Sequence, residues 1–78
     1  MKITREEMRK TRLQLAHEMH NYIFNLGNED LWNTWTIWGI SDEPDEEDFE
    51  IYADDGDNFR ELCELFGRLV QTDERENN

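Results

Sequence analysis

The sequence predicts an α+β domain in which two helices pack on one face of an antiparallel two-stranded hairpin, in the order α-β-β-α. Two observations support this fold class. Apolar residues recur at helical spacing towards both ends of the chain, and two segments between them are rich in aromatic and β-branched residues. A chain of 78 residues can bury one core only. We therefore expect a single domain over residues 1–71 and a flexible acidic tail over residues 72–78.

The first helix is predicted from about residue 5 to residue 26. Thr4 and Glu7 have the spacing of a capping box, in which each side chain satisfies the free backbone N–H of the other residue. Gly27 offers the left-handed conformation that ends many helices. Between these signals lies an apolar stripe made of Met8, Leu15, Met19, Tyr22, Ile23 and Leu26.

The middle of the chain predicts the two strands. Residues 31–40, with the sequence LWNTWTIWGI, have the composition of a strand, which we assign to the last six or seven of them. The alternative for the start of this segment is one helical turn capped by Asn28 and running through Trp32. Residues 49–53 alternate apolar and polar side chains as a half-buried strand does. A polar loop over residues 41–48 would join the two strands into a hairpin.

The last helix is predicted from the clearest amphipathic pattern in the chain. Asp54-Asp55-Gly56-Asp57 supplies a turn and acidic residues suited to a helix N-terminus. Gly67 weakens this helix by about 1 kcal/mol relative to alanine, and we expect close packing against the hairpin or the first helix to compensate. The apolar stripe consists of Phe59, Leu62, Cys63, Phe66, Leu69 and Val70.

The net charge is −12, and it is unevenly distributed. Residues 1–28 carry five basic and three acidic side chains, whereas residues 29–57 carry twelve carboxylates and no Lys or Arg. An anionic surface repels nucleic acid and anionic membranes and attracts basic proteins. We therefore expect the partner to be a basic protein surface, with no direct binding of nucleic acid and no membrane association.

The predicted hairpin would gather part of this charge on its outer face. If Phe49, Ile51 and Ala53 point into the core, strand alternation turns residues 48, 50, 52 and 54 outward. Carboxylates there could stand in for phosphates, and two aromatic rings could provide apolar anchors. The predicted partner-binding residues are Asp42, Glu43, Asp45, Glu46, Glu47, Asp48, Glu50, Asp54, Asp55, Trp38 and Tyr52.

The sequence supports a metal site or a catalytic site less well than it supports a partner-binding surface. The segment Asp54-Asp55-Gly56-Asp57-Asn58 lacks the ligand spacing of a calcium loop. His17 and His20 lie three residues apart, and Cys63 has no second cysteine with which to complete a zinc site. A Cys63/His20 pair is accompanied by no Gly-rich phosphate loop and no nucleophile elbow. We expect no metal, no cofactor and no enzymatic activity.

The presence of a single cysteine indicates the kind of cellular compartment in which the protein is expected. Cys63 cannot form an intramolecular disulfide, which fits a reducing environment. The apolar runs are too short for a signal peptide or a membrane span. A cytoplasmic location is expected.

The acidic segment Phe49-Glu50-Ile51-Tyr52-Ala53-Asp54-Asp55 between two helices, together with the size and charge of the chain, resembles the small acidic proteins that phages and mobile elements use against bacterial defence. Anti-CRISPR proteins belong to this class, and several are regarded as nucleic-acid mimics. The resemblance implies an inhibitor that occupies a basic nucleic-acid-binding surface.

The alternative function is that of a homodimeric adaptor that binds a protein through an apolar face around Trp38 and Tyr52. Homodimerisation would use strand edges or the basic stripe of Arg5, Arg9 and Arg12, which fall on one face of the first helix. Whether the chain is a monomer or a homodimer is left open by the sequence.

Overall fold

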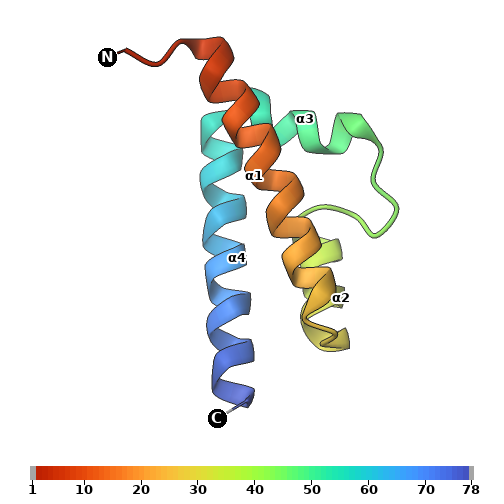
Figure 1. Ribbon diagram of the computed structural model, residues 1–78. Helices are drawn as coiled ribbons and strands as arrows, with labels where there is room; N and C mark the ends of the chain where they lie inside the picture. Colours follow the sequence, from red (N-terminus) through yellow and green to blue (C-terminus); the bar gives the residue numbers. More distant parts are fainter. Residues whose placement is uncertain (1, 78) are drawn as a thin grey trace.

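The computed structural model describes residues 2–77, and within them it contains four helices and no strand (Figure 1). The helices are α1 (Arg5–Asn25), α2 (Glu29–Trp38), α3 (Glu46–Asp54) and α4 (Gly56–Glu76). α4 thus runs through most of the segment predicted to be a flexible tail. Met1 and Asn78, the outer ends of the predicted domain and tail, lie outside the described residues.

The predicted α+β fold with its two-stranded hairpin is wrong, because both predicted strands are helical. Residues 35–38 form the end of α2, and residues 49–53 belong to α3. Each of these helices begins at a side-chain cap. The Asn28 side chain accepts a hydrogen bond from the Leu31 N–H, and Asp45 opens α3 in the same way. The alternative of a helical turn capped by Asn28 is confirmed, and the helix continues beyond Trp32 to Trp38.

The burial pattern shows why these segments are helices. In α3, Phe49 and Ala53 are buried, while Ile51 is 54% exposed. In α2, Trp35 is buried, while Ile37 is 70% exposed. Side chains four residues apart share a face in a helix and in a strand, but side chains two apart share a face only in a strand. The two exposed isoleucines therefore identify both segments as helical.

The two predicted helices near the ends of the chain are confirmed. Thr4 caps α1 by accepting a hydrogen bond from the Glu7 N–H, and its hydroxyl donates to the Glu7 carboxylate. Gly27 follows α1 with a φ of 68°, the left-handed conformation expected there. In α4, Leu62 and Leu69 of the predicted stripe are buried.

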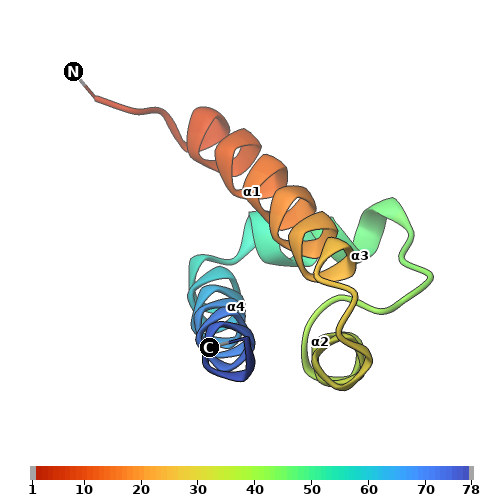
Figure 2. The same cartoon turned by 60° about the horizontal axis from the view of Figure 1, so that its bottom comes forward.

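The four helices pack as two antiparallel pairs (Figures 1 and 2). α2 and α4 are antiparallel, because the Asn28 amide donates to the Glu76 carboxylate at one end of the pair and Gly39 lies against Leu62 and Leu65 at the other. α1 lies across both of them, and α3 runs antiparallel to α1. The core between the helices consists of Ala16, Met19, Ile23, Leu31, Trp35, Ile40, Phe49, Leu62, Leu65 and Leu69.

Gly39 and Gly67 form a matched pair for testing how closely the helices approach. A Cβ atom at Gly39 would lie 2.8 Å from the Trp35 carbonyl oxygen and 3.2 Å from side-chain carbons of Leu62 and Leu65. At Gly67 nothing lies within 4 Å of such an atom, so the predicted close packing of Gly67 is wrong. Gly39→Ala is expected to lower the free energy of unfolding by about 1–3 kcal/mol, and Gly67→Ala to raise it by up to about 1 kcal/mol. Urea denaturation followed by circular dichroism measures both, and a Gly39→Ala variant as stable as the wild type would contradict the close approach.

Candidate anionic interface

Six of the predicted binding carboxylates lie within seven consecutive residues, in the loop after α2 and the first turn of α3. We call residues 42–48 the acidic end of α3. The loop leading into it forms the edge of the molecule in Figure 1, beyond the packed helices. Because these residues are neighbours along the chain, the fold keeps their charges together. They are Asp42, Glu43, Asp45, Glu46, Glu47 and Asp48.

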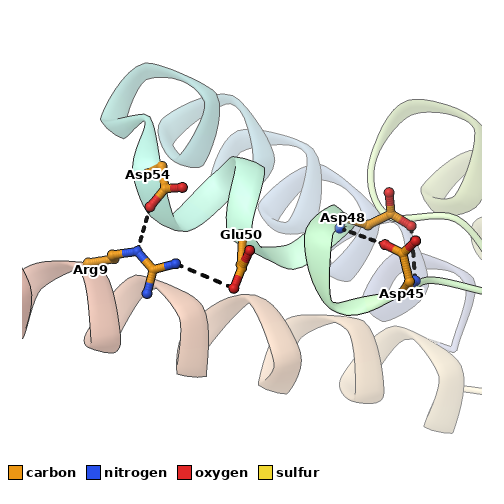
Figure 3. Close-up of polar contacts among 5 residues, drawn as sticks. All are labelled: Arg9, Asp45, Asp48, Glu50 and Asp54. Carbon is orange, nitrogen blue, oxygen red and sulfur yellow. Dashed lines mark hydrogen bonds and ion pairs between the residues drawn. The ribbon is translucent and has the colours of Figure 1, made fainter.

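Two of these carboxylates build the start of α3. The Asp45 side chain accepts a hydrogen bond from the Asp48 N–H at 3.2 Å, and the Asp48 side chain accepts one from the Asp45 N–H at 3.2 Å (Figure 3). Glu46 and Glu47 lie in the same first turn, where the partial positive charge of the helix N-terminus stabilises carboxylates. A helix of nine residues is marginal by itself. The acidic sequence therefore helps to hold α3 in its helical form.

The other four carboxylates are available for binding. Asp42, Glu43, Glu46 and Glu47 are exposed to solvent. Within residues 2–77, none of them forms an ion pair or a side-chain hydrogen bond, whereas Asp45 and Asp48 are occupied by the capping box. The acidic end of α3 thus combines a fixed backbone with four free acceptors for cationic groups.

Glu50 and Asp54, two further predicted binding residues, pair with α1, although both keep part of their surface in contact with solvent. The Arg9 guanidinium hydrogen-bonds Asp54 and lies 3.5 Å from the Glu50 carboxylate (Figure 3). The hydrogen bond and charge of Asp54 raise the pKa of Arg9, and Glu50 adds to the effect. Arg12 donates to the Ala53 carbonyl oxygen at 2.7 Å. Two arginines of the predicted basic stripe are therefore engaged within the chain, and Arg9 neutralises part of the predicted acidic patch.

Asp55 also has a role inside the fold. It ends α3 and caps α4, so it is the only residue between the two helices. Its carboxylate accepts hydrogen bonds from the backbone N–H groups of Asp57 and Asn58, at 2.9 and 3.3 Å. This matches the prediction that acidic residues would cap the last helix. The structure thus assigns Asp55 to the helix start and separates it from the free carboxylates of residues 42–48.

The two predicted aromatic anchors differ in their surroundings. Tyr52 is half-buried, and its hydroxyl donates to the Gly39 carbonyl oxygen at 3.1 Å. Burial, and then the charges of Asp48 and Glu61, raise the pKa of Tyr52. Trp38, by contrast, is 75% exposed at the end of α2. Trp38 is therefore the one predicted anchor that a partner can reach over most of its surface.

Trp38 borders a hollow that the sequence interpretation missed. The hollow lies between α2 and α4 and has a volume of about 320 Å³. Its residues could have been found by reading residues 29–38 as a helix, since Thr34 and Trp38 then share one face. The lining residues are Thr34, Trp38, Leu65, Arg68, Leu69 and Thr72.

The residues considered for metal binding are tied to the core. The His20 Nδ1 atom accepts a hydrogen bond from the indole N–H of Trp35 at 2.9 Å, and the His17 ring stacks on Phe49. Burial raises the pKa of the Cys63 thiol, which disfavours the reactive thiolate. In the described part of the chain, no three His, Cys, Asp or Glu side chains gather into a set that could hold a metal ion. None of the helices described is long and apolar enough to cross a membrane.

No known protein family, curated protein or solved structure matches this chain. Two features of the surface combine residues that the sequence singled out with solvent exposure: the acidic end of α3 and the hollow beside Trp38.

Proposed function

We propose that this protein is a non-enzymatic binding protein whose acidic end of α3 occupies a cationic surface on another protein, of the kind that binds nucleic acid. The observation that supports the proposal is the set of four exposed carboxylates at residues 42, 43, 46 and 47, which have no cationic partner in the described chain. Lys and Arg bind carboxylates and phosphates with the same charge-assisted hydrogen bonds. Such an anionic end competes with a nucleic acid for one cationic site.

The geometry of α3 favours this use of the charges. The capping box of Asp45 and Asp48 fixes the first turn of α3, so Glu46 and Glu47 extend from an ordered backbone. Pro44, which has a restricted φ, lies between the two pairs of residues at positions 42–43 and 45–46. Ordering these residues before binding reduces the entropy lost on association. The net charge of −12 adds long-range attraction to a cationic target.

Charge removal at the acidic end of α3 is expected to weaken binding to a cationic probe. The probe is a fluorescein-labelled deca-arginine peptide, and its anisotropy reports binding. Glu43→Gln, Glu46→Gln and Glu47→Gln, combined in one variant, should raise the dissociation constant about tenfold, because each exposed charge pair contributes about 0.2–1 kcal/mol. Wild-type affinity should fall steadily from about 50 to about 500 mM salt as counter-ions screen the charges.

A control variant with the same net charge tests whether the position of the charges matters. It combines Glu29→Gln, Glu64→Gln and Glu74→Gln, three exposed residues outside residues 42–48. This variant should bind the peptide with less than about a threefold loss. The wild type, and not the first variant, should also displace a single-stranded oligonucleotide from the peptide. Equal losses in the two variants would mean that binding follows net charge alone, and would contradict the proposal.

A further inference from the structure

Cationic side chains gather where the first turns of α1 pass the joint between α3 and α4 (Figure 1). A hollow at this place has a volume of about 450 Å³. Three of the eight Lys and Arg side chains of the chain line it, together with a single carboxylate. In a protein of net charge −12, this lining carries a local excess of positive charge. We call it the arginine hollow, and its lining residues are Arg5, Met8, Arg9, Arg12 and Asp54.

Two of these arginines are oriented by α3 and keep donors for a ligand. Arg9 directs its Nε atom to Asp54 and one terminal nitrogen to Glu50 at 3.5 Å (Figure 3). Arg12 directs its Nε atom to the Ala53 carbonyl oxygen. A guanidinium group has five N–H donors, so both groups retain several. Because these contacts already hold the two side chains, less entropy is lost when a ligand binds them.

Arg5 supplies a third cation. It is exposed in the first turn of α1, and it forms no ion pair in the part of the chain that the structure describes. Positions 5, 9 and 12 share one face of the helix, so the three side chains border the same space. Arginine binds phosphate through charge-assisted hydrogen bonds. A phosphate monoester, with nearly two charges and three acceptor oxygens, matches three arginines better than a carboxylate does.

An apolar hollow of about 370 Å³ adjoins the arginine hollow on the side of α4. The two hollows share Met8 and Arg12, so one ligand can extend from the first into the second. Both volumes lie in the range of about 300–1000 Å³ that is typical of small-molecule sites. Thr11 offers the only hydroxyl in the lining, which favours a hydrocarbon group over a nucleobase, because buried polar groups need partners. The lining residues are Ile3, Met8, Thr11, Arg12, Leu15, Gly56 and Phe59.

We propose that the two hollows together bind a small phosphate monoester that carries a hydrocarbon group. The phosphate lies among Arg5, Arg9 and Arg12, and the hydrocarbon group lies against Ile3 and Leu15. A single small anion is favoured over a nucleic acid or an anionic membrane, because the net charge of −12 repels large anionic partners. This site lies at the C-terminal end of α3, whereas the acidic end lies at its N-terminal end, so the inference does not depend on the proposed function.

Two-dimensional NMR of the full chain, titrated with octyl phosphate below its critical micelle concentration, tests the site. The wild type should show saturable shifts of the Nε–H signals of Arg5, Arg9 and Arg12 and of the backbone amides near Ile3 and Phe59. The dissociation constant should be on the order of 1 mM. Inorganic phosphate, adenosine monophosphate, octanoate and octyl glucoside each lack or replace one half of the ligand, and each should bind at least about fivefold more weakly.

Four variants assign the two halves of the site. Arg5→Gln should weaken octyl phosphate and inorganic phosphate alike, about tenfold, because it removes a charge-assisted contact. Arg75→Gln, its control at the other end of α4, should cost less than about threefold. Ile3→Ala should weaken octyl phosphate about fivefold and leave inorganic phosphate unchanged, whereas Ile51→Ala, outside both hollows, should affect neither. All four side chains are exposed, and circular dichroism verifies that the variants are folded.

Three results would overturn the proposed site. The first is the absence of saturable shifts at these residues when octyl phosphate is added. The second is binding of any comparison ligand as tightly as octyl phosphate, because the phosphate and the hydrocarbon group would then not both be recognised. The third is an equal loss in Arg5→Gln and Arg75→Gln, because binding would then follow the net charge and not the arginine hollow.

Discussion

Replacing Trp35 with alanine is expected to unfold the protein or leave it marginally folded. The Trp35 side chain is completely buried among the helices, and its indole packs near the rings of His20 and Phe66. Removing a buried tryptophan side chain costs about 3–5 kcal/mol. A domain of this length has a total stability of only about 4–12 kcal/mol, at about 0.05–0.15 kcal/mol per residue. Far-UV circular dichroism at 25 °C and urea denaturation measure the loss.

Trp38→Ala provides the matched control for this prediction. The same substitution at a side chain that is mostly exposed should change the free energy of unfolding by less than about 0.5 kcal/mol. The comparison belongs at low protein concentration, where self-association does not contribute to stability. If Trp35→Ala and Trp38→Ala had equal urea midpoints, the arrangement of α2 against the core would be wrong.

Acidification is expected to destabilise the fold through His20. Burial, and then the charge of His17, lower the pKa of His20 below its ordinary value of 6.5. The neutral ring accepts the indole N–H of Trp35 at Nδ1, and a protonated ring cannot. Since the folded-state pKa is the lower one, the contribution of His20 is fully present above pH 6.5 and is lost as pH falls through the folded-state value. Urea midpoints measured between about pH 7.5 and pH 5.5 should therefore decrease.

Two substitutions at His20 separate the effect of its hydrogen bond with Trp35 from the effect of its protonation. In His20→Asn the side-chain oxygen takes the place of Nδ1 and still accepts the indole N–H, whereas His20→Leu leaves this buried donor without its partner. We expect His20→Leu to lose about 1–3 kcal/mol of unfolding free energy, and His20→Asn to lose clearly less. In both variants the decrease of stability just below pH 6.5 should be smaller than in the wild type. A pH dependence identical in all three proteins would show that His20 does not cause it.

The outer helices could be predicted from the sequence, and the inner ones show where the pattern is ambiguous. Thr4, Gly27 and the long apolar stripes define α1 and α4 through local chemistry. In the middle, aromatic and β-branched residues favoured strands, but composition is a weaker signal than a helix cap. Asn28, with Asp45 and Asp48, supplied caps for both inner helices.

The ambiguity has a simple geometric origin. Trp35 in α2 and the pair Phe49 and Ala53 in α3 face inward whether their segments are read as strands or as helices. Ile37 and Ile51 distinguish the two readings most clearly, and both are apolar residues that the helix exposes. An exposed isoleucine is common on protein surfaces. The apolar pattern of these short segments could not decide between helix and strand.

The candidate site was predictable where it depends on neighbours in the sequence. Residues 42–48 stay together in any fold, and the structure keeps them together. The pairing of Glu50 and Asp54 with Arg9 depends on how α3 packs on α1, and Arg9 and Asp54 are 45 positions apart in the sequence. No local pattern contains that information. The hollow beside Trp38 was missed for the same reason, because α4 supplies four of its six lining residues.

The short connection at Asp55 limits where the sequence can accept insertions and deletions. An extra residue there would lengthen this extended joint by about 3.3 Å and displace α3 relative to α4. A displacement of that size would disturb the packing of Phe49 and Ala53 in the core and the contacts of Arg9 with its two carboxylates. Insertions and deletions should therefore be tolerated in the longer loop between α2 and α3, where they would alter the reach of the acidic residues, and rejected at position 55.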